Sequence, residues 1–264
     1  MSTFELHRGA LPLLISMPHA GTGLPPDLRS RLTDIAFELR DTDWHIPRLY
    51  GFAESLGAST LRPHYSRYLI DLNRPPDGRS LYPGQAGTGL CPLSQFDGQP
   101  LYRTGAEPDD AEIESRRRRY WQPYHDALTD ELARLRDIHG YAILFEAHSI
   151  ASRVPRLFDG RLPDLNLGTA RGESCAATLR ESAAAVLAGQ SDYSQVVDGR
   201  FIGGYITRHY GRPAQGVHAL QLEIAQCSYM DEAAPPFAYA AQRAAPLQAL
   251  LRRLLEALLA AARD

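Results

Sequence analysis

Lysine is absent from this 264-residue sequence, so every basic side chain other than histidine is an arginine. Schiff-base enzymes and Walker-type phosphate loops both depend on a lysine amine, and the chain can use neither. The formal net charge is −3, whereas a general nucleic-acid binder is usually basic. The composition therefore excludes lysine-based chemistry and argues against nucleic acid as a partner.

Cysteine is also scarce. The three cysteines, Cys91, Cys175 and Cys227, are odd in number and widely spaced, which indicates free thiols in a reducing cytosol and not a disulfide framework or a cysteine-rich zinc site. No segment approaches the roughly 20 apolar residues that a membrane span needs. The N-terminal residues lack the charged and apolar regions of a signal peptide. We therefore expect a cytoplasmic protein with no membrane partner.

Short apolar runs alternate with segments of helical periodicity along the chain. We expect strands over residues 11–17, 58–61, 65–74, 141–149, 196–201 and 218–224. Helices are expected over 28–39, 45–56, 109–138, 173–188 and 238–261, the third of them bent or interrupted at Pro123. The basic run 116–119 is flanked by acidic residues, which predicts a solvated, salt-bridged helix face. Alternating strands and helices with no evident linker indicate one α/β domain over residues 1–264.

Two long polar segments connect these elements. Residues 75–108 are rich in glycine and proline, and a loop of this length in a compact domain is usually functional or mobile. We interpret it as a flap over the site. Residues 152–171 are expected to form a polar loop.

The stretch Tyr141–Ser149 combines an apolar run with Glu146 and His148 at its end. Side chains two residues apart on a strand point the same way. Open α/β sheets bind their ligands beyond the carboxyl ends of their strands. This strand end is therefore a candidate functional site, although a lone histidine there is more often structural.

Four separated segments carry polar groups that suit a hydrolytic metal site. A catalytic zinc takes three protein ligands and keeps one position open for water, and His19, Asp43 and His148 form such a set. Glu223 is a candidate general base and acid. Arg67 and Arg74 suit a substrate carboxylate or a developing oxyanion. Because the chain has no compact zinc motif such as H-E-x-x-H, spacing alone is a weak signal.

Six segments add a second line of argument: 16–21 (SMPHAG), 41–44 (DTDW), 66–74 (SRYLIDLNR), 146–149 (EAHS), 201–211 (FIGGYITRHYG) and 221–223 (QLE). In this order they resemble the N-formylglutamate amidohydrolase (deformylase) family. The resemblance spans nearly the whole chain, and the stretch GGYITR points to the deformylases within the family.

The resemblance implies an α/β fold related to zinc carboxypeptidases and aspartoacylase, with three α/β/α layers around a central mixed β-sheet. It implies one catalytic Zn²⁺ and hydrolysis of N-formyl-L-glutamate, a small-molecule substrate, to formate and glutamate in bacterial histidine degradation. His19 and His148 would be zinc ligands and Glu223 the catalytic carboxylate. Asn73 and Arg74 would grip the α-carboxylate, and Arg67 would lie near the scissile carbonyl or bind the second carboxylate.

One departure concerns the third ligand. Carboxypeptidase-like enzymes take an acid three residues after the first histidine, but that position here is Thr22. The loop at Asp41–Asp43 is then the natural source, with Asp43 preferred, Asp41 second and His45 third. For reading the glutamate side chain we name Tyr205, Thr207 and Arg208, which can instead shape a turn near the site.

Three alternatives stay open at this point. The same machinery could act on another N-acyl amino acid or a C-terminal peptide, because pocket size depends on loops. The chain could be a metal-free binding protein, although intact His19, His148 and Glu223 argue against this. A Ser-His-Asp hydrolase is the weakest reading, because there is no G-x-S-x-G elbow and Ser149 directly follows His148. The oligomeric state is not indicated by the sequence.

Overall fold

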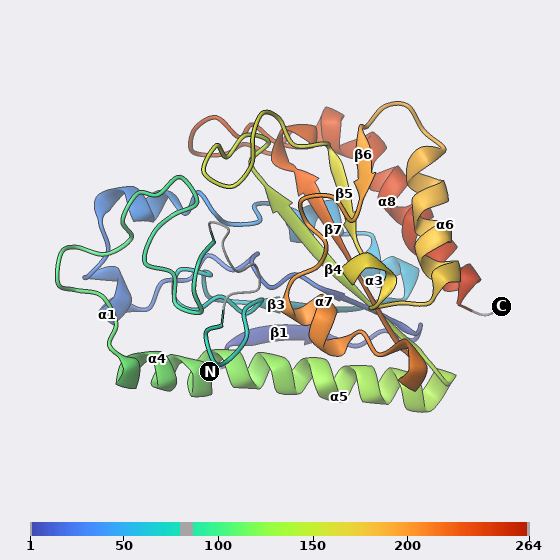
Figure 1. Ribbon diagram of the computed structural model, residues 1–264, viewed down its shortest axis with the longest axis horizontal. Coiled ribbons are helices and arrows are strands. Elements are labelled where there is room, and N and C mark those ends of the chain that lie inside the picture. Colours follow the sequence, from blue (N-terminus) through green and yellow to red (C-terminus); the bar gives the residue numbers. More distant parts are fainter. Residues whose placement is uncertain (1, 80–86, 263–264) are drawn as a thin grey trace.

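The computed structural model describes residues 2–79 and 87–262. Its centre is a seven-stranded sheet in the order β1-β3-β2-β4-β7-β5-β6 (Figure 1). The strands are β1 (Phe4–His7), β2 (Leu13–Ser16), β3 (Ser59–Pro63), β4 (Ala142–Ile150), β5 (Leu165–Gly168), β6 (Gln195–Val197) and β7 (Val217–Ala225). β3, β2, β4 and β7 run parallel, whereas β1 pairs antiparallel with β3 and β5 antiparallel with β7. The sheet is mixed, as the resemblance implied.

Helices cover both faces of this sheet, which confirms the three-layer α/β/α prediction (Figure 1). The helices are α1 (Pro26–Arg29), α2 (Ile46–Leu49), α3 (Ala53–Leu56), α4 (Asp110–Arg116), α5 (Gln122–His139), α6 (Ala177–Ala188), α7 (Tyr205–Tyr210) and α8 (Ala241–Ala261). One core cluster packs against α6 and α8, and the other against α5. Within residues 2–79 and 87–262, no helix has the length and apolar character needed to cross a bilayer.

The two faces of the central strands β4 and β7 carry different side chains: one face is mostly apolar, and the other includes the polar residues of the candidate site. On β4, Phe145 and Ala147 join the core that includes α6 and α8, whereas Leu144 joins the core that includes α5. Strand side chains alternate between faces, so Glu146 and His148 share the α5 side with Leu144. Gln221 and Glu223 of β7 follow the same alternation. Glu146 and His148 on β4, and Gln221 and Glu223 on β7, therefore all point to the α5 side of the sheet. The sequence pattern predicted that the members of each pair share a face.

The segment 65–74 is not a strand, and this prediction was wrong. β3 ends at Pro63, which has no N–H for a ladder, and Tyr65 makes only an isolated bridge to Gly23. The chain then turns, with the Leu69 amide donating to the Ser66 carbonyl over 2.9 Å. This turn puts Arg67 and Asp71 in an ion pair of 2.6 Å.

The helices also differ in detail from the predictions. The helix expected over 28–39 is α1 followed by a 3₁₀ turn, and the one expected over 45–56 is divided into α2 and α3. The interruption expected at Pro123 is a π-helical turn at Arg117–Trp121, directly before α5. Pro123 lacks the amide that a regular helix would use there. β1 was not predicted, and β5 lies inside the segment expected to be a polar loop.

The basic run 116–119 is only in part a solvated face. Arg117 and Arg118 pair with Glu114 on the helix surface, as expected. Arg116 is instead buried, and its guanidinium donates to the Leu69 carbonyl over 2.9 Å and pairs with Glu112. Arg116 therefore connects α4 to the turn within residues 65–74, which carries Arg67 and Arg74.

Candidate active site

Two neighbouring strand ends define the floor of the site. His148 of β4 lies directly opposite Glu223 of β7 in the parallel register. β2 ends at Ser16 and leads within three residues to His19, whose carbonyl accepts the Asp43 amide over 3.1 Å. The sheet thus brings three distant parts of the chain to one edge.

His19, Asp43 and His148 form a buried group whose ligand atoms all lie within 4.8 Å of one another. Asp43 Oδ2 lies 3.1 Å from His148 Nδ1 and 3.7 Å from His19 Nδ1. Ligands at 2.0–2.1 Å from a tetrahedral zinc are roughly 3.3 Å apart. The donor set and its spacing fit a zinc ion or a similar divalent cation.

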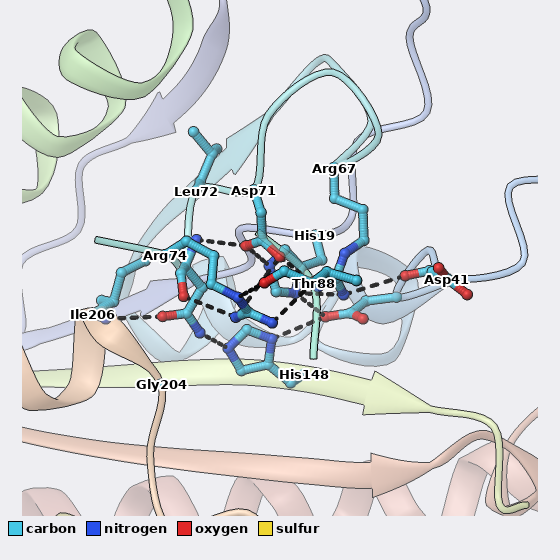
Figure 2. A network of polar contacts seen from close by, with 12 residues as sticks. His19, Asp41, Arg67, Asp71, Leu72, Arg74, Thr88, His148, Gly204 and Ile206 are labelled. Atoms are coloured by element: carbon cyan, nitrogen blue, oxygen red, sulfur yellow. Dashed lines mark hydrogen bonds and ion pairs between the residues drawn. The ribbon is translucent and has the colours of Figure 1, made fainter. Parts of the chain in front are cut away.

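The protonation of His19 fits the same interpretation. Its Nε2 lies 2.8 Å from Asp71 Oδ1, and its Nδ1 lies 3.2 Å from Arg67 Nη1 (Figure 2). Arg67 can only donate, so Nδ1 is the acceptor and Nε2 carries the proton. Burial and the Arg67 charge lower the pKa of His19 to about 4 despite the nearby carboxylates. Nδ1 therefore carries a lone pair, which a metal would bind in place of the Arg67 contact.

His148 lies between two carboxylates. Its Nδ1 faces Asp43, and its Nε2 lies 3.3 Å from Glu146 Oε2. Burial alone would lower the pKa of His148, but these carboxylates outweigh it and raise the pKa to about 10. A metal at Nδ1 would take the place of the proton on that nitrogen.

Asp41 and His45, the other two candidates for the third metal ligand, have different partners. Asp41 is buried, but its Oδ2 accepts the Phe96 amide over 2.9 Å, and burial raises its pKa to about 7. His45 Nε2 contacts the Phe237 carbonyl over 2.7 Å. Of the three candidates, only Asp43 joins the two histidines.

Arg67 is a buried cation held beside this group. Its Nη2 donates to Asp71 Oδ2 over 2.6 Å, and its Nη1 faces His19. The Arg67 and Arg74 charges hold the pKa of Asp71 well below its usual range despite burial. Asp71 therefore stays ionised and fixes both Arg67 and His19.

Asn73 connects this turn to β4 and to α7. Its Nδ2 lies 3.1 Å from His148 Nε2, and its Oδ1 accepts the Ile206 amide over 2.8 Å. A Cβ on Gly204 would lie 2.3 Å from Asn73 Nδ2, so any other residue there would push the Asn73 amide out of its position. The GGYITR segment thus acts at this point by holding the Asn73 amide in place.

Arg74 reaches the cavity from the same turn. Its Nε donates to the Thr88 carbonyl over 2.9 Å (Figure 2). The Arg74 carbonyl accepts from Trp121 Nε1 over 3.0 Å. His125 Nε2 contacts the Leu72 carbonyl over 2.8 Å. The aromatic side chains at the start of α5 therefore anchor the backbone that presents Asn73 and Arg74.

Glu223 and these groups line one cavity. Its other described lining residues are His19, Asp43, Arg67, Asn73, Arg74, Gly87, Phe96, His148, Ile150, Leu157, Arg200, Phe201, Gly204 and Gln221. Burial raises the pKa of Glu223 to about 7, against the opposing effect of the His148 charge. A carboxyl with this pKa can take and return a proton near neutral pH.

The predicted flap takes part in the cavity. Gly87 and Phe96 line it, and Thr88 and Leu90 accept hydrogen bonds from Arg74 and the Asp71 amide. Residues 80–86 lie outside the described part of the chain. Closure of this segment over substrate stays a prediction.

Tyr205, Thr207 and Arg208 do not line this cavity. The Tyr205 ring packs on His209 with centroids 4.9 Å apart and lies beside Trp121. Thr207 is buried, and Arg208 lines a separate cavity with Arg171 and Arg212. Their connection to the site runs through α7, on which the Ile206 amide donates to Asn73 Oδ1.

The sequence interpretation assigned no specific catalytic, binding or metal-ligand role to several residues at the site, although it named Glu146 with His148 at the strand end. Asp71 lies beside His19, and Glu146 lies beside His148. Both acids belong to the motif segments quoted for the resemblance. Arg200, Phe96 and Gln221 line the cavity from loops and β7, and no spacing pattern marked the first two. Ser149 is hydrogen-bonded to Tyr229 over 2.8 Å and is not among the residues that line the cavity of Glu223.

Comparison with known proteins identifies the family. The profile of the family described as N-formylglutamate amidohydrolase matches residues 11–230. N-formylglutamate deformylase of Pseudomonas aeruginosa is 58% identical over 97% of this chain and 96% of its own length. The enzyme of the same name from Pseudomonas putida is 53% identical over 97% and 95%.

Solved structures show the same fold. A crystal structure of N-formylglutamate amidohydrolase from Ralstonia eutropha JMP134 superposes with a TM-score of 0.81 at 28% identity, covering 100% of this chain and 98% of that one. A gene product from Agrobacterium tumefaciens, at a TM-score of 0.71, 17% identity and coverage of 100% and 97%, shares the fold. The match of family profile, relatives and fold leads to one conclusion: the chain is an amidohydrolase that belongs to the N-formylglutamate amidohydrolase family.

Proposed function

We propose that this protein hydrolyses N-formyl-L-glutamate to formate and L-glutamate with one bound zinc ion. The observation that carries the proposal is the convergence of His19, Asp43 and His148 beside Glu223 in one cavity. The names of relatives at 58% and 53% identity support the substrate.

The two histidines and Asp43 would hold the metal. A bound zinc supplies a Lewis acid and lowers the pKa of its water to about 7. Asp71 and Glu146 would orient the histidine rings from behind, which fixes the tautomers needed for ligation.

Glu223 would act as general base and then as general acid. It takes a proton from the attacking water and returns it to the departing amine of glutamate, so its carboxyl ends the cycle in its starting state. Arg67 would stabilise the negative charge that develops on the formyl oxygen. Its ion pair with Asp71 keeps this charge in place before substrate arrives, so it needs little reorganisation.

Asn73 and Arg74 would bind the α-carboxylate. Arg74 provides the charge, and the Asn73 amide is already oriented between His148 and Ile206. Any role of Tyr205, Thr207 and Arg208 would be to support this region from α7.

The direct test is a formate assay on purified protein with N-formyl-L-glutamate, N-acetyl-L-glutamate and N-formyl-L-methionine. The proposal expects formate from N-formyl-L-glutamate at the highest kcat/KM. A preference for the acetyl compound would keep the hydrolase and overturn the formyl assignment. Absence of turnover with all three would overturn the proposed function.

A further inference from the structure

We propose that Arg200 binds the side-chain carboxylate of the substrate and so selects dicarboxylic N-acyl amino acids. This inference rests on the proposed function, because it assigns the second carboxylate of the same substrate. None of the six motif segments contains Arg200.

The substrate class sets a demand for charge. N-formylglutamate carries two carboxylates and no ammonium group, because its amine is acylated. Each carboxylate that leaves water needs a cation or several hydrogen-bond donors in the cavity. A site for this dianion therefore needs two binding positions besides the groups at the scissile bond, and arginine serves such a position best because it supplies both charge and several donors.

Among the described residues that line the cavity, the arginines are Arg67, Arg74 and Arg200. Arg67 is committed to Asp71 at 2.6 Å and lies against His19, which places it at the reacting carbonyl. Arg74 extends from the turn that also presents Asn73, so both address the same carboxylate. Arg200 is the remaining arginine of the lining, and it comes from a different segment, after β6.

Arg200 is held in the cavity wall by its neighbours. Its Nε donates to the Leu157 carbonyl over 2.9 Å, and its guanidinium lies 5.3 Å from the centroid of the Phe201 ring. Leu157 and Phe201 also line the cavity. An arginine held at Nε by a carbonyl and packed against an aromatic ring is oriented before binding, and its planar fork suits a bidentate contact with a carboxylate.

A second source of positive charge lies in an adjoining cavity of about 340 Å³, which shares Phe96 and Ile150 with the first. It is lined by Arg40 and Arg153. Arg40 pairs with Glu38 at 2.6 Å, whereas Arg153 is exposed to solvent. Arg153 is therefore the matched control for Arg200.

The test compares kcat/KM for N-formyl-L-glutamate with that for N-formyl-L-glutamine, whose side chain has the same shape without the charge. Wild type, R200Q, R200K and R153Q are measured, with thermal unfolding to check folding. In R200Q we expect the preference for glutamate over glutamine to fall about 10- to 100-fold, mainly through KM, as for loss of a charge-assisted hydrogen bond. R200K should keep part of the preference, and R153Q should keep all of it.

Each other outcome overturns the inference in a recognisable way. An active wild type with an unchanged preference in R200Q, or an equal loss for both substrates, overturns the role of Arg200 alone. A collapse of the preference in R153Q moves the carboxylate to the adjoining cavity. Absence of formate release from wild type overturns the proposed function together with this inference.

Discussion

The side-chain amide of Asn73 lies between a candidate metal ligand and the helix that follows the GGY segment. Its Nδ2 is 3.1 Å from His148 Nε2, while its Oδ1 accepts the Ile206 amide over 2.8 Å. One side chain therefore couples the position of His148 to that of α7. The tight approach of Gly204 to Asn73 makes this coupling testable without changing either polar residue.

Replacing Gly204 with alanine should displace Asn73. The new Cβ would meet Asn73 Nδ2 at 2.3 Å, closer than real Cβ contacts occur. We expect kcat/KM for N-formyl-L-glutamate to fall at least tenfold. Gly89→Ala is the control, because its Cβ would meet nothing closer than 3.9 Å. Equal activity of both variants would contradict the positioning role.

The carboxylates behind the histidines should control metal affinity. Asp71→Asn weakens the acceptor for the His19 ring N–H, and Glu146→Gln removes the charge that lies 3.3 Å from His148 Nε2. Losing such partners typically costs 10- to 100-fold in metal affinity. A competition titration of zinc against a chromophoric chelator measures this. Glu131→Gln is the control, since Glu131 is a buried carboxylate paired with Arg134 on α5. The idea fails if all three variants bind zinc as tightly as wild type.

Removing Arg74 should act on substrate binding. Arg74→Ala takes away the charge assigned to the α-carboxylate, so KM should rise about 10- to 100-fold while kcat changes less. Arg79→Ala is a suitable control, because Arg79 pairs with Asp77 on the surface of the same segment. A fall in kcat at unchanged KM would remove Arg74 from the clamp.

The pKa of Glu223 predicts a pH-dependent stability in metal-depleted protein. Folding raises this pKa from 4.5 to about 7, so the folded state favours the protonated carboxyl. The contribution to stability is present at low pH and is lost as the pH rises through about 7. The Tm of Glu223→Gln relative to wild type should therefore be higher at pH 8 than at pH 5. The same difference at both pH values would show that folding does not shift this pKa.

Part of this architecture could be predicted from the sequence. β4 and β7 are long apolar strands with polar residues near their carboxyl ends, and parallel pairing brings such ends together, so the sequence could predict that His148 and Glu223 lie side by side. The residue types also indicated His19 and Asp43, and the resemblance strengthened that choice. The structure distinguishes the two aspartates of the loop at residues 41–43. Asp43 lies beside both histidines, whereas Asp41 accepts a hydrogen bond from the Phe96 amide.

Other features could not be found this way. The alternating pattern of residues 65–74 resembles a strand, but the segment has left the sheet after Pro63 and its polar side chains face one another in a turn. Arg200 reaches the cavity from a loop, and no periodicity marks such a residue. β5 is only four residues long and gains its order by pairing with β7 and β6, which a local pattern does not reveal.

The central claim is that hydrolysis depends on a metal held by His19, Asp43 and His148 and on proton transfer by Glu223. The most direct test measures metal content and formate release from N-formyl-L-glutamate on the same samples of wild type and Glu223→Gln, before and after chelation and zinc return. The account predicts about one zinc per chain in both proteins, activity in wild type that is lost and restored with the metal, and a loss of about 10²- to 10⁴-fold in Glu223→Gln. Formate release that persists in metal-free wild type, or full turnover by Glu223→Gln, would contradict it.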